Sequence, residues 1–284
     1  MVKKILGQCY IWLIMIFMYA PVLLLVVFSF TSSKIIGANQ WYGFTFQLYA
    51  DLWHEEALLR ALGNTIIIAI TSAVVSTVLG TMGAIGAFYS KRKMRKTIDS
   101  VTQIPIANAE IVMALSLTLL FVFVGQKIIG KDILSFWTLL IGHTVLAVPF
   151  VYTSVKPKLE QMDQSLYEAA IDLGCTPRQA LNKVIIPEVM PGILSGFFLS
   201  ITLSLDDVVI TEFTRGPGLL SGESSIETLS TYIQSVIKRS AIPPAARALV
   251  SLIFLSVVIG VAVVTIVKNN KRNKLVMRKG HYHG

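Results

Sequence analysis

The chain has 284 residues and a formal net charge of +9, and 54% of its residues are hydrophobic while only 14% are charged. Soluble globular proteins carry about 25% charged residues, so this composition excludes an ordinary water-soluble domain. The basic residues stand in short runs between long apolar stretches, which is typical of membrane proteins and argues against nucleic-acid binding.

Six apolar segments are long enough to cross a bilayer, which takes roughly 20 mostly apolar residues. In chain order, we expect membrane-spanning helices at about residues 10–30, 65–89, 101–124, 134–155, 190–213 and 246–267. The first segment follows two lysines, as a signal peptide would, but it is too long for one and shows no clear cleavage site. The sequence therefore predicts an all-α, multi-pass bundle of six transmembrane helices.

The positions of Lys and Arg predict the orientation of this bundle. With the N-terminus in the cytoplasm, most of the 25 Lys and Arg residues fall in inside segments, including the runs at 91–96 and 268–279. Cytoplasmic loops carry such an excess of positive charge, so we expect both termini in the cytoplasm. The chain then divides into a first helix with an external segment (1–63), a five-helix core (64–267) and a basic cytoplasmic tail (268–284).

Small residues indicate close helix packing at two places. The second segment is rich in Ala, Ser, Thr and Gly, and Gly192 and Gly196 form a GxxxG pattern at the start of the fifth. Small side chains let helix backbones approach closely in a membrane. We interpret both features as packing surfaces rather than as binding sites.

The longest inside connection, residues 160–190, predicts two short helices joined by a sharp turn. Ser165 or Asp163 could cap the first helix, and Glu168 lies three residues after Ser165, as in a capping box. Gly174 is a natural helix end, and the Thr-Pro pair two residues later is a typical helix start. Such a pair of helices would form a rigid knob outside the membrane, although an amphipathic connection lying on the membrane surface is the alternative.

The order of residues in this connection resembles the EAA loop of ABC importer permeases. The matching residues are Glu168-Ala169-Ala170, then Gly174 after three residues, then Val184-Ile185-Ile186-Pro187 after nine more, where the family has Ile-x-Leu-Pro. The resemblance implies the type I importer permease fold and a coupling helix that inserts into a separate ATPase. The residues it assigns to coupling are Glu168, Ala169, Ala170, Gly174 and Pro187. ATP and magnesium would then belong to the partner, and this chain would bind no cofactor.

The chain itself shows no catalytic or metal-binding motif. The stretch from Gly125 to Asp132 fits a phosphate-binding loop up to its last position, where Asp stands in place of Ser or Thr. Cys9 and Cys175 lack metal-ligand spacing and are interpreted as packing residues. We therefore expect a non-catalytic membrane subunit with no metal site, rather than a membrane enzyme.

Acids and histidine inside predicted spans are costly and mark substrate pathways. Glu110 lies mid-way along the third span, His143 lies within the fourth, and Asp206 and Asp207 lie in the outer half of the fifth, with Glu212 following near its outer end. The four residues predicted for the pathway are Glu110, His143, Asp206 and Asp207. Adjacent helical residues point about 100° apart, so at most one of the two aspartates is expected to face the pathway. A hydrogen bond to a neighbouring helix is the alternative role for each.

Similarity to the permeases of spermidine/putrescine importers extends over roughly residues 10 to 265. It is carried by Ser29–Ser33, Glu110–Leu117, His143 with Val148-Pro149-Phe150, and Thr202–Val209. The chain looks closest to the second of the two permeases in such a system, although the family has Asp where this chain has Glu110. The resemblance implies import of polyamines, whose ammonium groups carboxylates and aromatic faces would bind.

The same resemblance implies partners and a location. We expect a sister permease forming a heterodimer, two copies of an ATP-binding subunit, an external polyamine-binding protein, and the lipid of a bacterial inner membrane. The alternatives are an importer of another solute, such as an iron, thiosulfate or molybdate complex, and an independent channel or ion-coupled transporter. The membrane acids disfavour an anion carrier, and the EAA-like loop disfavours an independent channel.

Overall fold

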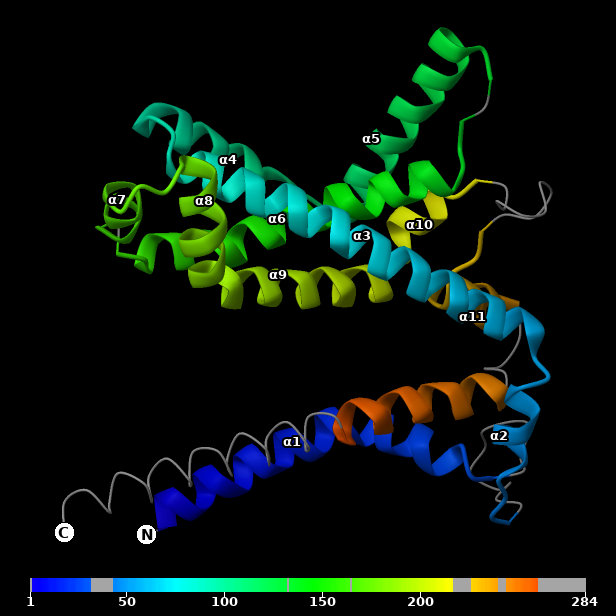
Figure 1. Ribbon diagram of the computed structural model, residues 1–284. Helices are drawn as coiled ribbons and strands as arrows, with labels where there is room; N and C mark the ends of the chain where they lie inside the picture. Colours follow the sequence, from blue (N-terminus) through cyan, green and yellow to red (C-terminus); the bar gives the residue numbers. More distant parts are fainter. Residues whose placement is uncertain are drawn as a thin grey trace. The chain divides into compact units, whose positions relative to one another are not determined.

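The computed structural model describes residues 2–31, 43–131, 133–163, 165–216, 226–239 and 244–259. Within these ranges the chain is helical, apart from turns and one isolated β-bridge between Thr31 and Phe44. The longer helices in Figure 1 are α1 (Val2–Phe28), α3 (Glu56–Phe88), α4 (Arg92–Ala107), α5 (Glu110–Phe123), α6 (Phe136–Gln161), α9 (Ile186–Asp206) and α11 (Leu229–Arg239). The shorter ones are α2 (Gln47–Leu52), α7 (Ser165–Asp172), α8 (Pro177–Ala180) and α10 (Val209–Thr214).

Five helical stretches are long and apolar enough to cross a membrane. They are Gly7–Phe28, Glu56–Phe88, Glu110–Ile129, Phe136–Gln161 and Pro177–Asp206. These stretches confirm that the first five predicted segments are membrane-length helices. A shorter apolar helix, Pro244–Ile259, overlaps the sixth segment, whose remainder lies outside the described residues together with the tail at 268–284. The count of six spans therefore stays a prediction.

The chain forms two compact units, Met1–Leu59 with Ser235–Gly284, and Arg60–Gln234. In the first unit, aromatic rings from the end of α1 and the segment after it pack together, with the Phe30 and Phe44 rings stacked at 5.3 Å. The Tyr49 hydroxyl lies 2.7 Å from that of Ser29 and 3.1 Å from that of Ser251. These contacts join the C-terminal end of α1 to α2 and to the helix Pro244–Ile259.

The core of the larger unit lies between α6 and α9, which run side by side (Figure 1). Val151, Val155 and Leu159 of α6 are fully buried and form one cluster with Val189 of α9 and with alanines of α3. Gly192 and Gly196 face α6 so closely that an added Cβ would lie within about 3 Å of its backbone. This contact confirms the interpretation of the GxxxG pattern as a packing surface.

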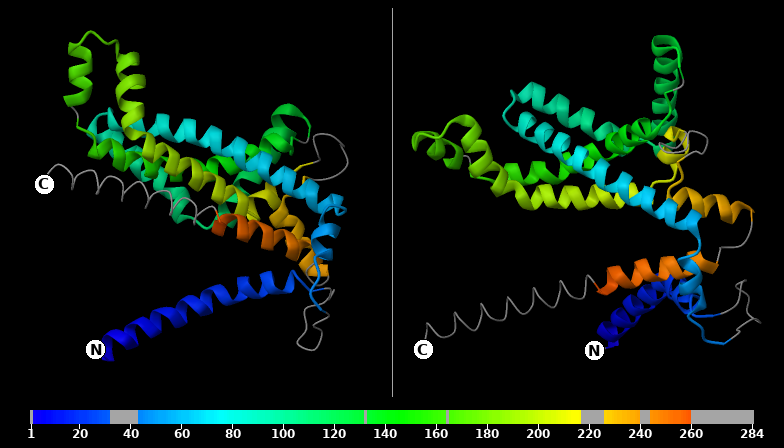
Figure 2. Two further views of the ribbon diagram at one scale, coloured as in Figure 1. Left: turned by 60° about the horizontal axis from the view of Figure 1, so that its bottom comes forward. Right: turned by 45° about the vertical axis from the view of Figure 1, so that its right-hand side comes forward.

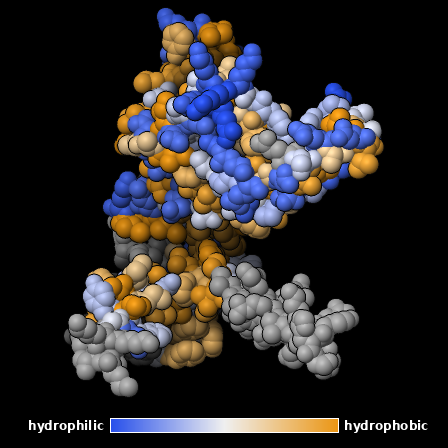
Figure 3. All heavy atoms as spheres, turned by 90° about the vertical axis from the view of Figure 1, so that its left-hand side faces the viewer, coloured by the Kyte–Doolittle hydropathy of each residue, from blue (hydrophilic) through white to orange (hydrophobic). Residues whose placement is uncertain are grey.

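Helix α4 is held to α6 mainly by polar contacts and has no buried residue. The Asp99 carboxylate accepts hydrogen bonds from the Tyr152 hydroxyl at 2.6 Å and from the Lys156 ammonium at 2.7 Å. One turn earlier, Arg95 forms an ion pair with Glu160. In Figure 3, hydrophilic side chains gather over the end of the larger unit that carries the start of α4 and the α7–α8 connection.

Two of the predicted spans are broken, which corrects the sequence-based boundaries. The span expected at 101–124 is split between α4 and α5 by extended backbone at Asn108 and Ala109. The span expected at 190–213 ends at Asp206, and α10 begins at Val209 after extended backbone at Asp207. Hydropathy averages over a window of about 19 residues, so it does not register breaks of one or two residues inside an apolar run.

Candidate functional site

The two helix breaks lie beside a cavity of about 250 Å³ in the larger unit. Its lining comes from the end of α4, the start of α5, the middle of α6 and the end of α9. The lining residues are Pro105, Ile106, Asn108, Glu110, Met113, Leu146, Phe150, Leu203, Asp206 and Asp207. Three of the four ionisable residues predicted for the pathway are therefore brought to one cavity.

Glu110 does not lie mid-way along a span, as the sequence suggested, but in the first turn of α5, immediately after the break. An acidic side chain at this place is favoured by the positive end of the helix dipole. The break also places Glu110 beside the end of α9, so that its carboxylate lines the cavity together with the two aspartates.

Asp206 and Asp207 are adjacent but have different surroundings. The Asp207 side chain is buried, and it accepts hydrogen bonds from the backbone N–H groups of Ile210 at 3.0 Å and Thr211 at 2.8 Å. These bonds satisfy donors at the start of α10 and hold the break open, because they replace helical bonds. Asp206 is exposed at the cavity and forms no hydrogen bond within the described residues. Asp207 thus shapes the site, while Asp206 is available to a ligand.

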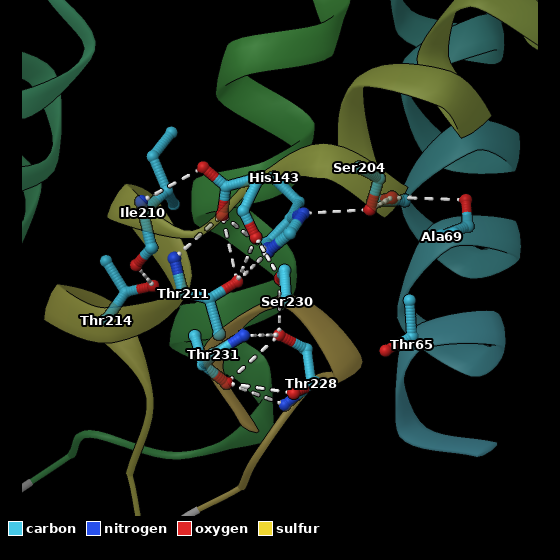
Figure 4. Close-up of polar contacts among 12 residues, drawn as sticks. Thr65, Ala69, His143, Ser204, Ile210, Thr211, Thr214, Thr228, Ser230 and Thr231 are labelled. Carbon is cyan, nitrogen blue, oxygen red and sulfur yellow. Dashed lines mark hydrogen bonds and ion pairs between the residues drawn. The ribbon is translucent and has the colours of Figure 1, made fainter. Parts of the chain in front are cut away.

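His143 is buried behind the cavity and does not line it. Its Nδ1 lies 2.8 Å from the Ser204 hydroxyl and its Nε2 lies 2.9 Å from the Thr211 hydroxyl (Figure 4). Thr211 in turn donates to the Asp207 carboxylate at 2.9 Å, so its oxygen accepts from Nε2–H of His143. The imidazole therefore joins α6 to α9 and α10, which is the helix-to-helix role that the sequence left open.

Sequence reasoning missed the non-ionisable part of the lining. Asn108 is at the helix break after α4, and Phe150 lines the cavity from α6. Asn108 follows a helix that contains Pro105, and this proline was the one local signal of an interruption. Among the described residues, no group of three His, Cys, Asp or Glu side chains is arranged to hold a metal ion.

The predicted knob is present at the opposite end of α6 and α9. Helices α7 and α8 project from the ends of the long helices in both views of Figure 2. Gly174 has a φ of +86°, and the bonds from Cys175 N to Ala170 O and from Gly174 N to Ile171 O form a Schellman turn. Thr176 caps α8. The Thr176 hydroxyl oxygen accepts the backbone N–H of Gln179, and the side-chain oxygen of Gln179 accepts the backbone N–H of Thr176.

The first helix of the knob begins differently from the predicted capping box. Asp163, not Ser165, supplies the capping side chain, and its carboxylate accepts the Ser165 backbone N–H at 3.0 Å. This hydrogen bond lowers the pKa of Asp163. Asp163 and Ser165 were both compatible with the sequence as the cap, since aspartate and serine are both common capping residues.

The knob exposes an apolar stripe. Leu166 and Leu173 are 41% and 86% exposed, and Ala169 lies between them on the same face of α7. By contrast, Ala170 is buried and Tyr167 packs against the core cluster beneath.

The helices, the helix breaks and the knob together define a multi-pass α-helical membrane transport protein. Residues 77–273 match the family model described as the binding-protein-dependent transport system inner membrane component. The chain belongs to this family, and it is a non-catalytic permease subunit of an ABC importer.

Similar proteins and structures agree with this assignment. The chain is 33% identical over 262 residues to the spermidine/putrescine transport system permease protein PotC of Escherichia coli (strain K12), covering 92% of this chain and 94% of the relative. It is 33% identical over 245 residues to the putrescine transport system permease protein PotI of the same strain, covering 84% and 81%. A bacterial ABC transporter that imports the acidic polysaccharide alginate has the same fold, with a TM-score of 0.67 at 16% identity, covering 94% of this chain and 96% of the other.

Proposed function

We propose that this permease imports polyamines, of the spermidine and putrescine class. The observation that carries the proposal is the convergence of Glu110, Asp206 and Asp207 on one cavity. Carboxylates are acceptors for the ammonium groups of such a substrate, and charge-assisted hydrogen bonds are the strong ones. The ring of Phe150 in the same cavity adds a face for cation–π contact.

The helix breaks bring helix ends of both signs to this lining. The C-terminal ends of α4 and α9 both stop at the cavity, and each brings the partial negative charge of its last carbonyl groups. The positive ends at the starts of α5 and α10 are offset by Glu110 and by Asp207. A cavity of this kind suits an organic cation, and it disfavours an anionic solute such as thiosulfate or molybdate.

The subunit would work in an assembly located in the inner membrane of a bacterium, with both termini in the cytoplasm. A sister permease would complete the translocation pathway, and an external binding protein would deliver the polyamine. Two copies of an ATP-binding subunit, holding ATP and magnesium, would power the assembly, and one of them would dock on the α7–α8 knob. The support for this arrangement is family membership, the similarity to PotC and PotI, and the exposed stripe on α7.

The cavity acids provide the first test. Glu110→Gln and Asp206→Asn are each expected to reduce uptake of labelled spermidine or putrescine at limiting concentration by about 10- to 100-fold. This range corresponds to the loss of one hydrogen bond to a charged group, about 1.5–3 kcal/mol. Uptake would be measured in cells that carry the whole transporter, with the amount of subunit in the membrane determined in parallel.

Glu212→Gln is the matched control for these variants. Glu212 is an exposed acid on α10 that pairs with Arg215 at 3.0 Å and does not line the cavity. It is expected to leave uptake unchanged. Normal uptake by both cavity variants would refute the polyamine pathway. Inhibition of uptake by an anion instead of by spermidine would favour the alternative, an importer of another solute.

The knob provides a second test. Leu173→Asp places a charge at the exposed tip, and Gly174→Asp forces a residue with a side chain to adopt a φ of +86°, which costs about 1–2 kcal/mol. Both variants, and Glu168→Lys, are expected to reduce co-purification of the ATPase and to abolish uptake while the bundle stays folded. Asp172→Asn, an exposed substitution on the same helix, is the control. Full uptake by the Leu173 and Gly174 variants would show that the knob is not the docking surface.

A further inference from the structure

The knob is joined to α9 through a single wide, π-helical turn at Leu181–Ile185. In this turn the backbone N–H of Ile186 donates to the carbonyl of Leu181, five residues earlier, instead of four. From Pro177 to Asp206 the chain is therefore one continuous helical stretch with one extra residue inserted in it. Such turns are rare and occur frequently at functional sites.

The packing explains why the wide turn forms. Ala180 and Ile185 are both buried, and Ile185 belongs to the same core cluster as Val189. Residues five apart lie roughly 140° apart on a regular α-helix, so the two would not share one buried side. The i-to-i+5 turn brings both to the same side. The intervening Asn182 and Lys183 are exposed and take no part in this packing.

Pro187 gives a second, local reason for the turn. In a regular α-helix its missing N–H would leave the carbonyl of Lys183 without a partner, and its ring would collide with that carbonyl. Pro187 is the second residue of α9, directly after the wide turn. The turn moves the preceding carbonyls out of the regular α-helical positions, so the proline is accommodated without ending the helical stretch.

We infer that this π-helical turn sets the rotational position of the α7–α8 knob relative to α9, and that coupling to the ATPase depends on that position. The inference rests on the proposed docking role of the knob. It assigns Pro187 a positioning role instead of a contact with the ATPase. It also explains the spacing between Gly174 and Val184. These two residues are separated by nine others, one more than a regular helix would need at this place.

The test changes the length of the turn. Insertion of one alanine after Lys183 places Ala180 and Ile185 six residues apart and is expected to rotate the knob by about 100° with a shift of about 1.5 Å along the axis. Uptake by this variant is expected to fall at least about 10-fold, since a tenfold loss corresponds to only about 1.4 kcal/mol of coupling. Deletion of Asn182 instead leaves the two residues four apart, about 40° apart on a regular α-helix, so the knob is expected to keep its position without the wide turn and uptake is expected to be retained. Asn182→Ala keeps the length and is expected to behave like the unmodified chain. Restoring the length, by deleting Asn182 from the insertion variant, is expected to recover uptake.

Knob position is measured separately, by the distance between spin labels at Asp172→Cys and Ser195→Cys with both native cysteines changed to serine. Both labelled residues are exposed, on α7 and α9. A changed distance in the insertion variant, restored with the length, supports the inference; an unchanged distance, or normal uptake with a changed distance, overturns it. If the insertion variant does not fold, deletion of both Asn182 and Lys183, which leaves Ala180 and Ile185 three residues apart, provides the same test with the opposite rotation.

The two proposals can fail separately. If the Leu173 and Gly174 variants lose uptake but the insertion variant does not, the π-turn inference fails and the docking surface stands. If none of these variants loses uptake, the coupling role of the knob itself is refuted.

Discussion

Replacing Asp207 with alanine is expected to lower the free energy of unfolding by about 3–5 kcal/mol and to abolish uptake. The substitution removes the acceptor of two backbone N–H groups at the start of α10 and of the Thr211 hydroxyl. Each buried donor left without a partner costs about 1–3 kcal/mol. His143 also loses its neighbour, because its Nε2 lies 3.4 Å from the Asp207 carboxylate.

Asp206→Ala is the matched control for this effect, because the two aspartates are adjacent and differ in their contacts. Asp206 is exposed and caps nothing, so its loss is expected to reduce uptake while leaving thermal unfolding of the purified protein unchanged. Thermal unfolding and uptake would be measured on both variants. If both lower the melting temperature equally, or if Asp207→Ala melts like the unmodified protein, the division of roles between the two aspartates is wrong.

The double variant Gly192→Ala, Gly196→Ala is expected to separate α6 from α9 and to produce the second large loss. A Cβ at Gly192 would lie 2.9 Å from the carbonyl oxygen of Ser154, and one at Gly196 would lie 3.0 Å from the Cα of Val151. Because both obstacles are backbone atoms, side-chain rearrangement gives no relief. Overpacking of this kind costs about 1–3 kcal/mol at each position.

Gly86→Ala separates the steric effect from any general effect of losing glycine. Nothing lies within 4 Å of a Cβ at Gly86, which is also inside a long helix, α3. Its replacement is expected to leave stability unchanged or to raise it by about 0.5–1 kcal/mol, since glycine is the poorer helix former. Unfolding temperature and the yield of folded protein from membranes would be compared. Equal stability of the double variant and the unmodified protein would refute the close α6–α9 contact.

The local features of the chain could be predicted well from sequence. Membrane-length helices follow from runs of apolar residues, and five of them are present. The knob followed from turn chemistry: Gly174 ends one helix in the left-handed conformation, and Thr176 caps the next. These signals are readable because capping and turn preferences act between residues at most five positions apart.

The helix breaks were not predicted, because their causes are partly distant. Asp207 interrupts the fifth span where its carboxylate reaches Thr211, and that threonine is held by His143, 68 residues earlier in the chain. The sequence predicted that at most one of the two neighbouring aspartates faces a pathway, but it did not show how the two differ. Both line the cavity, and only the packing of α6 against α9 and α10 decides that Asp207 is the one whose carboxylate is held by α10.

By itself, then, the sequence determined the class of protein, the membrane-length helices and the position of the knob, all of which depend on hydropathy and short-range backbone chemistry. The tertiary structure decided that Glu110 and Asp206 meet at a cavity between two helix breaks, and that His143 lies behind it. It also decided the wide turn between the knob and α9, beside which Ala180 and Ile185 are buried. Each of these depends on which side chains are buried together, and burial is set by contacts between helices that are far apart in the chain.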